Sequence, residues 1–563
     1  MSSPVSRGQI GDWGGRLTWV QSSALSGSNR LWTLVDGAEV VVTPEGLSLS
    51  SSLYGYGGTT WCAIDGARVF TLHEREGVAR VISVAGTIES SWPLPDGSVG
   101  CPVVQGDDVL FLLDGPPRGE RRVCRLSLVT GQISTVYASS SFLSRLAVNG
   151  DRVAWTEWSP RTVPWEESSL VLARGTTVLN IESVQSSPGV SWGPPVAHGD
   201  SFATTCEDAE WANVVRDVDQ REHRIDVSPG GAALSLVSWF GTSRLLASQG
   251  GDLAVVTAKD SARGVSVISD AGVVTLEGAM TSIEDVAMVA SSVVVAGRRP
   301  EHSDRVELFH DQWQAVACGE EVSDPAATAS WRLGTSSVPF VWWGVDNPST
   351  IVIDIHGGPT GEAGLRWSAS ISRWRAKGFA VASVDYRGST SYGRSYRRAL
   401  NGGWGRLDVD DVASVISELA TEFPSARIVV AGNSAGGLTA LRVATLPAVW
   451  GAMVHYPVTD AATIIAMSHE FEAGYNDNLF GTSDPSQLQD RRIEVEDLRR
   501  VFVTHGVEDS VVPIAGTRAF VRDARARGVD INYIEIPGEG HGYRRAESLA
   551  LVAAAEERFL LNQ

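Results

Sequence analysis

The chain has 563 residues, of which 43% are hydrophobic and 20% are charged, and its formal net charge is −20. A chain of this length exceeds what one hydrophobic core organises, so two or more domains are expected. The acidic balance argues against nucleic acid or an anionic membrane as a partner, because both require a basic surface. The same balance fits a cationic substrate, although acidic surfaces most often serve solubility.

The start of the chain and the cysteines indicate a cellular location and a lack of cofactors. Residues 1–7 lead directly into polar sequence and do not resemble a signal peptide, and no stretch reaches membrane-spanning length without charge or glycine. The five cysteines are scattered, so their spacing predicts neither a disulfide framework nor a metal site, and most are expected to be buried small apolar residues. We therefore expect a cytoplasmic protein without metal or other cofactor, and leave homo-oligomerisation open.

The first part of the chain, up to about residue 324, consists of short runs rich in Val, Trp, Thr and Ser, broken by Gly and Asp. A polar residue followed by a short apolar strand recurs seven times, at Arg16–Trp19, Arg68–Thr71, Asp108–Phe111, Arg152–Trp155, Ser201–Thr204, Arg244–Ala247 and Ser292–Val295. The spacings are 52, 40, 44, 49, 43 and 48 residues. Four-stranded propeller blades run about 40–50 residues each. The spacing predicts an all-β propeller of seven blades, and the alternative is a pair of β-sandwiches with accidental regularity.

From about residue 326 the pattern changes to strands that alternate with helices. A strand is expected over residues 350–355, a helix over 368–377, a second strand over 379–384 and a second helix over 408–421. This alternation predicts a doubly wound, mainly parallel sheet. We therefore expect a propeller domain over residues 1–325 and an α/β catalytic domain over residues 326–563.

Residues 431–437, with the sequence AGNSAGG, form the most informative stretch. They follow an apolar strand and precede a helical run, so the G-x-S-x-G pattern stands in a strand–turn–helix context. In that context the pattern is a nucleophile elbow, in which the serine occupies a strained turn and the glycines permit close passage of the backbones. The pattern predicts that Ser434 is a nucleophile, with Gly432 and Gly436 as the spacing glycines.

Two further residues follow in the chain order of an α/β-hydrolase. Asp509 lies just after the apolar strand 501–503, and His541 lies just after the strand 533–536. A serine hydroxyl needs a base to remove its proton as it attacks, and His541 is the candidate base. Asp509 would fix the imidazole tautomer and stabilise the imidazolium. The order Ser434, Asp509, His541 predicts an α/β-hydrolase domain with serine hydrolase activity.

A tetrahedral intermediate also needs two hydrogen-bond donors for its oxyanion. We expect one to be the backbone N–H of Ala435 and the other to be the backbone N–H of Gly358, in the loop after the strand 350–355. His356 in the same loop is interpreted as a residue that braces the loop, because His541 already supplies the base.

Several further motifs surround these residues. They are HGGP at 356–359, DYRGSTSYGR at 385–394, GWG at 403–405 with Asp408 and Asp411, HEFE at 469–472, HG at 505–506 with Asp509 and VP at 512–513, and GEGHG at 538–542. In combination they resemble the prolyl oligopeptidase family, in its acylaminoacyl-peptidase and dipeptidyl-aminopeptidase-like branch. The resemblance implies a serine peptidase whose N-terminal β-propeller caps the active site, in agreement with the repeats above.

Two positions depart from the family pattern. Many family peptidases carry an arginine two residues after the triad aspartate to hold a substrate carbonyl, whereas this chain has Val511. Asn433 stands where glycine or arginine is commoner. The first change puts the longer-peptide specificity of acylaminoacyl peptidases in doubt and leaves aminoacyl amides or short peptides open.

A free α-amino group in a water-poor cavity would need a carboxylate partner. Glu472 in the segment near the site is one candidate, and Glu207 and Glu210 of the propeller are others. Trp211 is added because residues 208–213 loosely resemble a propeller segment of the family. Each of these carboxylates has the alternative of being an ordinary solvated or structural residue.

The sequence therefore favours a serine peptidase or amidase that cleaves short peptides or aminoacyl or acyl-aminoacyl substrates through an acyl-enzyme on Ser434. A second hypothesis is a dedicated amide or ester hydrolase of an aminoacylated small metabolite. A third is acyl transfer or cyclisation from the same acyl-enzyme to an amine. A fourth is a non-enzymatic propeller scaffold with a relic hydrolase domain, against which the intact set of catalytic residues argues.

Overall fold

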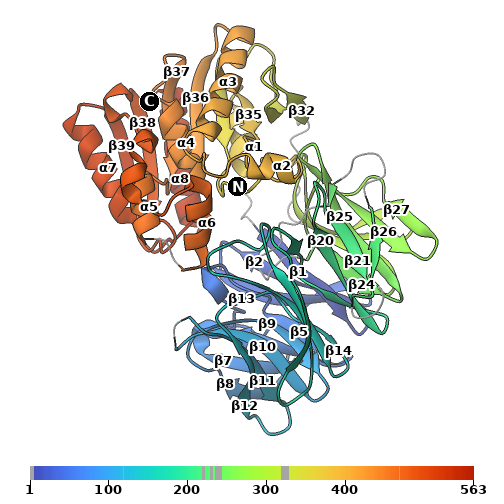
Figure 1. Cartoon of the computed structure of the whole chain (residues 1–563). Helices are drawn as coiled ribbons and strands as arrows, with labels where there is room; N and C mark the ends of the chain where they lie inside the picture. The colour runs from blue at the N-terminus through green and yellow to red at the C-terminus, as the bar shows by residue number, and fades with distance from the viewer. Residues whose placement is uncertain are drawn as a thin grey trace. The chain divides into compact units, whose positions relative to one another are not determined.

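The computed structural model of the chain describes residues 5–117, 119–218, 222–227, 233–234, 244–318, 329–467 and 470–562. The chain forms two compact units (Figure 1). The first contains residues 1–259, 263–298 and 304–321, and the second contains residues 260–262, 299–303 and 322–563. The domain boundary expected after residue 325 falls within residues 319–328, which lie outside the described residues.

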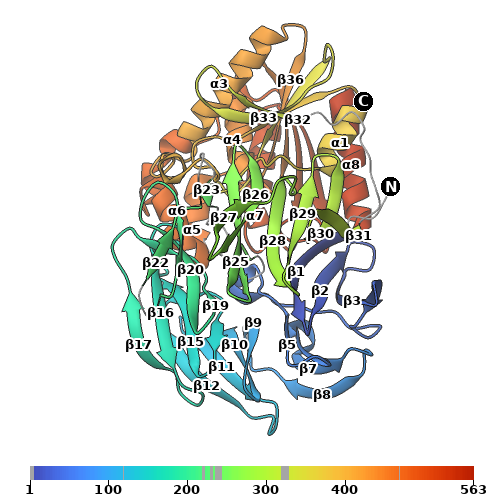
Figure 2. The same ribbon diagram turned by 90° about the vertical axis from the view of Figure 1, so that its right-hand side faces the viewer.

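The first unit is a β-propeller whose described strands form seven antiparallel sheets (Figure 2). Four sheets have four strands each. These are β1 (Val5–Trp13), β2 (Arg16–Ser23), β3 (Ser28–Val35) and β4 (Ala38–Val41); β5 (Trp61–Ala63), β6 (Arg68–His73), β7 (Val78–Ser83) and β8 (Ile88–Pro93); β9 (Ser98–Gln105), β10 (Asp108–Asp114), β11 (Arg121–Ser127) and β12 (Ile133–Ser139); and β28 (Ser282–Val289), β29 (Ser292–Arg299), β30 (His302–Phe309) and β31 (Trp313–Cys318).

In the other three sheets the first strand is broken into two short segments. These sheets are β13 (Phe142–Leu143), β14 (Ala147–Asn149), β15 (Arg152–Trp158), β16 (Ser169–Arg174) and β17 (Asn180–Gln185); β18 (Ser191–Trp192), β19 (Val196–His198), β20 (Ser201–Glu207), β21 (Asn213–Arg216) and β22 (His223–Ile225); and β23 (Ala233–Leu234), β24 (Leu246–Gln249), β25 (Asp252–Lys259), β26 (Ala262–Ser269) and β27 (Gly272–Thr275). The prediction of seven blades is confirmed.

One of the seven recurrences falls on a different strand of its blade from the other six. Six of them begin the second strand of a blade, whereas the run from Arg244 to Ala247 overlaps β24, a segment of the first strand. The second strand of that blade is β25, which begins at Asp252. The run that begins at Arg244 and the strand β25, which begins at Asp252, both have a polar residue followed by apolar ones, so the pattern alone does not separate them.

The blades are joined to one another and the ring is closed by the first and last blades. First strands of successive blades contact each other from β5 through β9, β14, β19 and β24 to β28, and β28 contacts β1. Trp61 Nε1 donates to Gln9 O at 2.8 Å and so joins β5 to β1. Ile10 and Trp19 pack with Val294 in one buried cluster between the first and last blades. This closed ring excludes the sandwich alternative.

The second unit is an α/β-hydrolase fold around an eight-stranded sheet of order β32-β33-β35-β34-β36-β37-β38-β39. The strands are β32 (Ala329–Leu333), β33 (Pro339–Trp343), β34 (Thr350–Ile355), β35 (Ala380–Val384), β36 (Arg427–Asn433), β37 (Val449–His455), β38 (Arg500–Gly506) and β39 (Asp530–Ile536). The strands β35, β34 and β36 to β39 run parallel, whereas β32 and β33 pair antiparallel at one edge.

Helices cover both faces of this sheet. They are α1 (Ala369–Ala376), α2 (Arg394–Arg398), α3 (Leu407–Glu422), α4 (Ala435–Val443), α5 (Ala461–Met467), α6 (Glu470–Phe480), α7 (Ile514–Ala526) and α8 (Ala546–Leu561). Trp374 of α1 and Phe559 of α8 pack with Val429 of β36 on one face. A Cβ on Gly432 would meet Ala440 of α4, so α4 covers the opposite face. This doubly wound arrangement confirms the predicted fold class.

The cysteines and helices bear on two further expectations. Cys101, Cys124 and Cys206 are buried, Cys62 is half-buried, Cys318 is exposed, and all five are free thiols. Among the helices in the described part of the chain, none combines the length and the apolar character needed to cross a bilayer. A cytoplasmic location stays a prediction.

Candidate active site

The nucleophile elbow places Ser434 at the carboxyl end of β36, between strand and helix α4. Ser434 has φ 52° and ψ −122°, a conformation that a residue with a side chain rarely adopts. A Cβ on Gly432 would lie 2.3 Å from Gly436 O, and one on Gly436 would lie 2.4 Å from Ile355 O. Both positions therefore require glycine, as the sequence motif predicts, and the turn projects the half-buried Ser434 beyond the end of the sheet.

Ser434, His541 and Asp509 are brought together in one hydrogen-bonded series. His541 Nε2 lies 3.0 Å from Ser434 Oγ, and His541 Nδ1 lies 2.8 Å from Asp509 Oδ2. The Asp509 side chain is fully buried, whereas the His541 side chain is 22% exposed. Ser434 follows β36, Asp509 follows β38 and His541 follows β39, so three parallel strands present the three side chains at one edge of the sheet.

The surroundings of Asp509 keep its carboxylate charged. Burial by itself would raise the pKa of Asp509, but hydrogen bonds from His505 and His541 outweigh burial and hold this pKa well below its usual range. The N–H groups of Val511 and Val512 both donate to Asp509 Oδ1 at 2.9 Å. A charged acceptor at Oδ2 places the proton of neutral His541 on Nδ1 and leaves Nε2 free to accept the Ser434 proton.

The loops that carry Asp509 and His541 are locked against each other through their backbones. Glu508 N–H donates to Glu539 O at 2.9 Å. A Cβ on Gly506 would lie 2.4 Å from Gly540 O, so only glycine allows the two loops to approach this closely. This contact fixes the separation of acid and base.

The expected oxyanion donors lie next to the nucleophile. A Cβ on Gly357 would lie 3.3 Å from Ser434 Cβ, which places the peptide between Gly357 and Gly358 beside the serine. Gly358 has φ +124°, and a Cβ there would lie 2.8 Å from Thr360 N. Within the described residues, no backbone or side-chain acceptor takes a hydrogen bond from Gly358 N–H or Ala435 N–H. Both donors are therefore available to a substrate oxygen.

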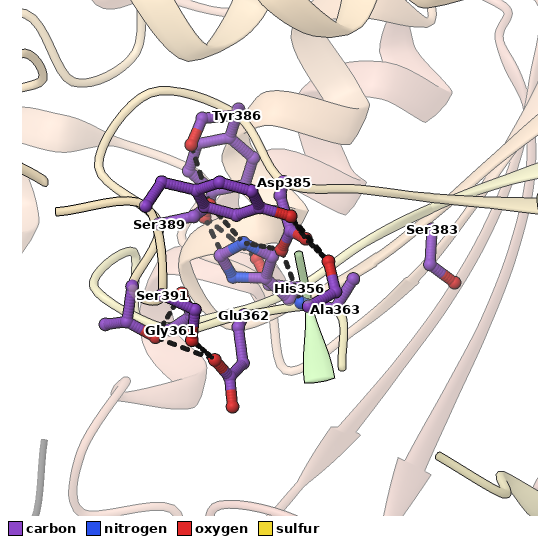
Figure 3. Close-up of polar contacts among 12 residues, drawn as sticks. His356, Gly361, Glu362, Ala363, Ser383, Asp385, Tyr386, Ser389 and Ser391 are labelled. Carbon is purple, nitrogen blue, oxygen red and sulfur yellow. Dashed lines mark hydrogen bonds and ion pairs between the residues drawn. The ribbon is translucent and has the colours of Figure 1, made fainter. Parts of the chain in front are cut away.

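His356 braces the loop that carries Gly358 (Figure 3). His356 Nδ1 lies 2.8 Å from Gly357 O, and His356 Nε2 lies 2.8 Å from Ser389 Oγ. Its ring stacks on the ring of Tyr386 with centroids 4.4 Å apart and an interplanar angle of 14°. Burial lowers the pKa of His356 to about 4, so its ring is neutral near neutral pH. These contacts agree with a bracing role and not with a second base.

The candidate substrate residues fall in both units. Glu207 ends β20 and is buried, Glu210 is exposed and Trp211 is half-buried, and all three belong to the first unit. Their proximity to Ser434 stays a prediction. Glu472 lies in α6 of the second unit and is half-buried. His469, which belongs to the motif at 469–472, lies outside the described residues.

Helix α6 reaches the oxyanion loop through one hydrogen bond. Thr360 N–H donates to Tyr475 Oη at 2.7 Å, and Thr360 is two residues after Gly358. Glu472 precedes Tyr475 by three residues, so the two side chains are neighbours on one side of the helix. Glu472 therefore lies one helical turn from a residue that contacts Thr360, and its closeness to Ser434 and its role stay predictions.

Tyr456, which contacts His541, was not predicted from the sequence. The Tyr456 ring meets His541 edge to face with centroids 4.7 Å apart. Asn433 Nδ2 donates to Tyr456 Oη at 3.3 Å, so the residue that departs from the family pattern beside the nucleophile holds this tyrosine. Tyr456 directly follows β37, the strand next to β36, and this placement at a parallel strand end could have marked it.

Comparison with known proteins yields matches to the second unit and to the whole fold. Residues 365–563 match the prolyl oligopeptidase family. The dipeptidyl aminopeptidase BIII of Pseudoxanthomonas mexicana is 26% identical over 231 residues, which are 38% of this chain and 33% of that protein. The acylamino-acid-releasing enzyme of Arabidopsis thaliana is 27% identical over 224 residues, which are 35% of this chain and 28% of that protein. The matched stretches thus span about a third of the length of these curated relatives.

Solved structures share the fold of the whole chain. A puromycin hydrolase has a TM-score of 0.88 at 22% identity, covering 98% of this chain and 94% of that one. A puromycin-hydrolyzing peptidase of Mycobacterium tuberculosis has a TM-score of 0.85 at 20% identity, covering 99% and 94%. At these identities the likeness establishes the arrangement of a propeller followed by a hydrolase domain. The family match shows that residues 365–563 belong to a domain of the prolyl oligopeptidase family.

Proposed function

We propose that the chain is a serine peptidase or amidase that cleaves an amide bond of a short aminoacyl or peptide substrate through an acyl-enzyme on Ser434. The observation that carries the proposal is the series from Ser434 through His541 to Asp509, with contacts of 3.0 and 2.8 Å. The two backbone N–H groups beside it, at Gly358 and Ala435, complete the set of groups that acyl transfer requires.

The chemistry follows from these positions. Ser434 Oγ attacks the carbonyl carbon while its proton passes to His541 Nε2, and Asp509 stabilises the imidazolium through Nδ1–H. The carbonyl oxygen becomes an oxyanion between Gly358 N–H and Ala435 N–H. His541 then gives its proton to the leaving amine nitrogen, and the C–N bond breaks to leave an ester on Ser434. Water, deprotonated by His541, cleaves this ester and restores the serine.

Three observations support a small substrate with a free amino end. Relatives of this chain include an enzyme named dipeptidyl aminopeptidase. Val511 is apolar and half-buried, so it offers no charge to hold a blocked acyl group. Glu472 lies three residues before Tyr475, whose hydroxyl accepts a hydrogen bond from Thr360 N–H, and its carboxylate is the group that we expect to pair with an ammonium.

Matched substrates test this proposal directly. Free aminoacyl p-nitroanilides and their N-acetylated counterparts should be assayed side by side with wild type and Glu472→Gln, and we expect the free amines to be better substrates. An interaction with a charged group is worth about 1.5–3 kcal/mol, so Glu472→Gln should raise KM about ten- to hundredfold for the free amine and little for the blocked one. Glu470→Gln, at an exposed position of the same helix, is the control for the loss of one charge. Equal rates for both substrates, or a preference for the acetylated one, would restore the acylaminoacyl interpretation.

A second candidate is hydrolysis of an aminoacylated small molecule. It is favoured by Val511 and by two structural neighbours that are described as hydrolysing puromycin. Turnover of puromycin and of dipeptidyl amides, followed by mass spectrometry, separates the two candidates. An added amine nucleophile in the same assay would reveal acyl transfer as a ligated product instead of the free acid.

A further inference from the structure

Tyr456 has a backbone conformation that a residue with a large side chain rarely adopts, with φ +37°. Such conformations are costly unless the surroundings hold them, and they concentrate at functional sites. Tyr456 N–H donates to Thr504 O at 2.7 Å. On either side of Tyr456, His455 O accepts from Ser434 N–H at 3.1 Å, and Val458 N–H donates to Ser434 O at 3.0 Å. The turn that carries Tyr456 is therefore fixed to the backbone of the nucleophile.

We propose, on the basis of the function proposed above, that Tyr456 is a positioning residue that holds the imidazole of His541 against Ser434. The Tyr456 ring meets the imidazole edge to face, with centroids 4.7 Å apart and an interplanar angle of 63°. Because the turn of Tyr456 is bound to Ser434, its ring places the base relative to the nucleophile. This contact limits the tilt of the imidazole, on which the distance of 3.0 Å between His541 Nε2 and Ser434 Oγ depends.

Two further contacts hold the Tyr456 ring itself. Asn433 Nδ2 donates to Tyr456 Oη at 3.3 Å. The ring of Tyr543 packs edge to face against the Tyr456 ring, with centroids 5.4 Å apart and an interplanar angle of 81°. Tyr543 follows His541 by two residues, so the loop that carries the base also supplies a side chain that packs on Tyr456.

A series of hydrogen bonds fixes Tyr543 in turn. Glu556 Oε1 lies 3.0 Å from His455 Nε2, and His455 Nδ1 lies 2.7 Å from Thr504 Oγ1. A carboxylate only accepts hydrogen bonds, so His455 Nε2 carries the proton. In the neutral ring Nδ1 then accepts the Thr504 hydroxyl, which leaves Thr504 Oγ1 to accept from Tyr543 Oη at 2.6 Å. Thr504 therefore holds Tyr456 through its carbonyl and Tyr543 through its hydroxyl.

The far end of the series is a buried carboxylate in helix α8. Arg373 Nη2 donates to Glu556 Oε2 at 3.0 Å. Burial by itself would raise the pKa of Glu556, but its contacts with His455 and Arg373 outweigh burial and hold this pKa below its ordinary value. Glu556 is thus a charged acceptor, and the series from α8 to Tyr543 has a donor and an acceptor at each step.

Two variants of Tyr456 separate the ring from the hydroxyl. Tyr456→Phe keeps the ring that contacts His541, whereas Tyr456→Leu removes it. The experiment measures the second-order rate at which a fluorophosphonate labels Ser434, together with kcat and KM for an aminoacyl p-nitroanilide and the melting temperature. We expect Tyr456→Leu to lower the labelling rate and kcat about tenfold with KM within about twofold, and Tyr456→Phe to stay within about threefold of wild type. Wild-type rates in Tyr456→Leu, equal losses in both variants, or a loss confined to KM would overturn the positioning role.

Thr504 gives a matched pair that tests whether the series acts through Tyr456. Thr504→Val removes the hydroxyl at nearly constant volume, and Thr504→Ser keeps it. We expect Thr504→Val to slow labelling about fivefold and Thr504→Ser to restore the rate to within about twofold of wild type. The double variant Thr504→Val/Tyr456→Leu should label as slowly as Tyr456→Leu alone, because residues that act through one contact are not additive. A double variant whose loss is the product of the two single losses would contradict the proposal.

Tyr543→Phe applies even where the variants of Thr504 and Tyr456 do not fold, since it removes only one hydroxyl group. We expect it to slow labelling about threefold at an unchanged KM, and a wild-type labelling rate would contradict the role of the series. Failure of the proposed function itself is recognised separately, because wild type would then not be labelled at Ser434 at all.

Discussion

In the proposed mechanism, the two sides of Ser434 use different chemical groups for a single reaction. On the base side, His541 and Asp509 are ionisable side chains that must move and balance a proton. On the oxyanion side, Gly358 and Ala435 contribute backbone N–H groups, and the histidine beside them, His356, is kept neutral by burial. The surroundings of each histidine, and not its residue type, therefore determine whether it acts as a base or supports a loop. His541 has one nitrogen on the nucleophile, whereas the two nitrogens of His356 contact Gly357 O and Ser389 Oγ.

Replacement of the nucleophile should have the largest effect, because both sides act through it. We expect Ser434→Ala to lower kcat about 10⁶-fold with the fold intact, as loss of a triad nucleophile typically does. The measurement is turnover of a chromogenic aminoacyl amide in a contamination-free preparation, with circular dichroism as the check on folding. A variant that kept more than about one percent of the wild-type rate would remove Ser434 from the mechanism.

Asp509→Asn should prevent His541 from acting as a base, while it leaves the oxyanion donors Gly358 N–H and Ala435 N–H intact. The N–H groups of Val511 and Val512 require an oxygen at the position of Oδ1, so the new amide nitrogen must face His541 Nδ1. This orientation would put the histidine proton on Nε2, where it cannot accept from Ser434. We expect kcat to fall about 10⁴-fold. A loss below about tenfold would show that Asp509 does not set the tautomer.

His505 offers a smaller test of how the base side is supported. His505 is fully buried, donates from Nε2 to Val512 O at 2.9 Å and lies 3.4 Å from Asp509 Oδ2. His505→Gln keeps a donor at the Nε2 position and should stay near the wild-type rate, whereas His505→Leu should lower kcat about tenfold through loss of a bond to a charged group. If both variants have the same kcat at matched stability, then His505 stabilises the fold and does not influence the Asp509 carboxylate.

The smallest effect on catalysis is expected at Asp408, a buried aspartate that contrasts with Asp509. Thr439 Oγ1 donates to Asp408 Oδ2 at 2.5 Å, but burial dominates and raises the pKa of Asp408 to about 6, above its ordinary value of 3.8. The protonated form of Asp408 is therefore favoured by folding. This contribution to stability is fully present below pH 3.8, and it is lost as the pH rises through about 6 and the carboxyl group ionises. Asp509, whose pKa is lowered, behaves in the opposite way and contributes stability at neutral pH.

Asp408→Asn should consequently stabilise the protein at pH 8 by up to about 3 kcal/mol, and the gain should disappear at pH 4. The check is the unfolding midpoint of wild type and variant at both pH values, with activity measured at pH 8. A variant that is equally stable at pH 8, or less stable, would show that the buried, charged carboxylate of Asp408 does not destabilise the folded protein.

Prediction from the sequence succeeded where a function depends on one local pattern. The elbow could be recognised because Gly432 and Gly436, which close contacts with Gly436 O and Ile355 O require, stand within one short stretch beside Ser434. The contacts of Ser389 with His356 and of Tyr475 with Thr360 join segments 33 and 115 residues apart, so no local pattern reports them. The propeller shows the same limit. Its period is visible in the sequence, but the run from Arg244 to Ala247 is recognised as overlapping a first strand only because Leu246 to Gln249 pair with β25.

The central claim is that Ser434 is a nucleophile activated by His541. The most direct measurement is mass spectrometry of the protein after treatment with a fluorophosphonate, with the adduct mapped to a peptide. We predict one adduct per chain, located on Ser434, absent in Ser434→Ala and strongly slowed in His541→Ala. An adduct on another residue, or none on a folded wild-type protein, would contradict the account.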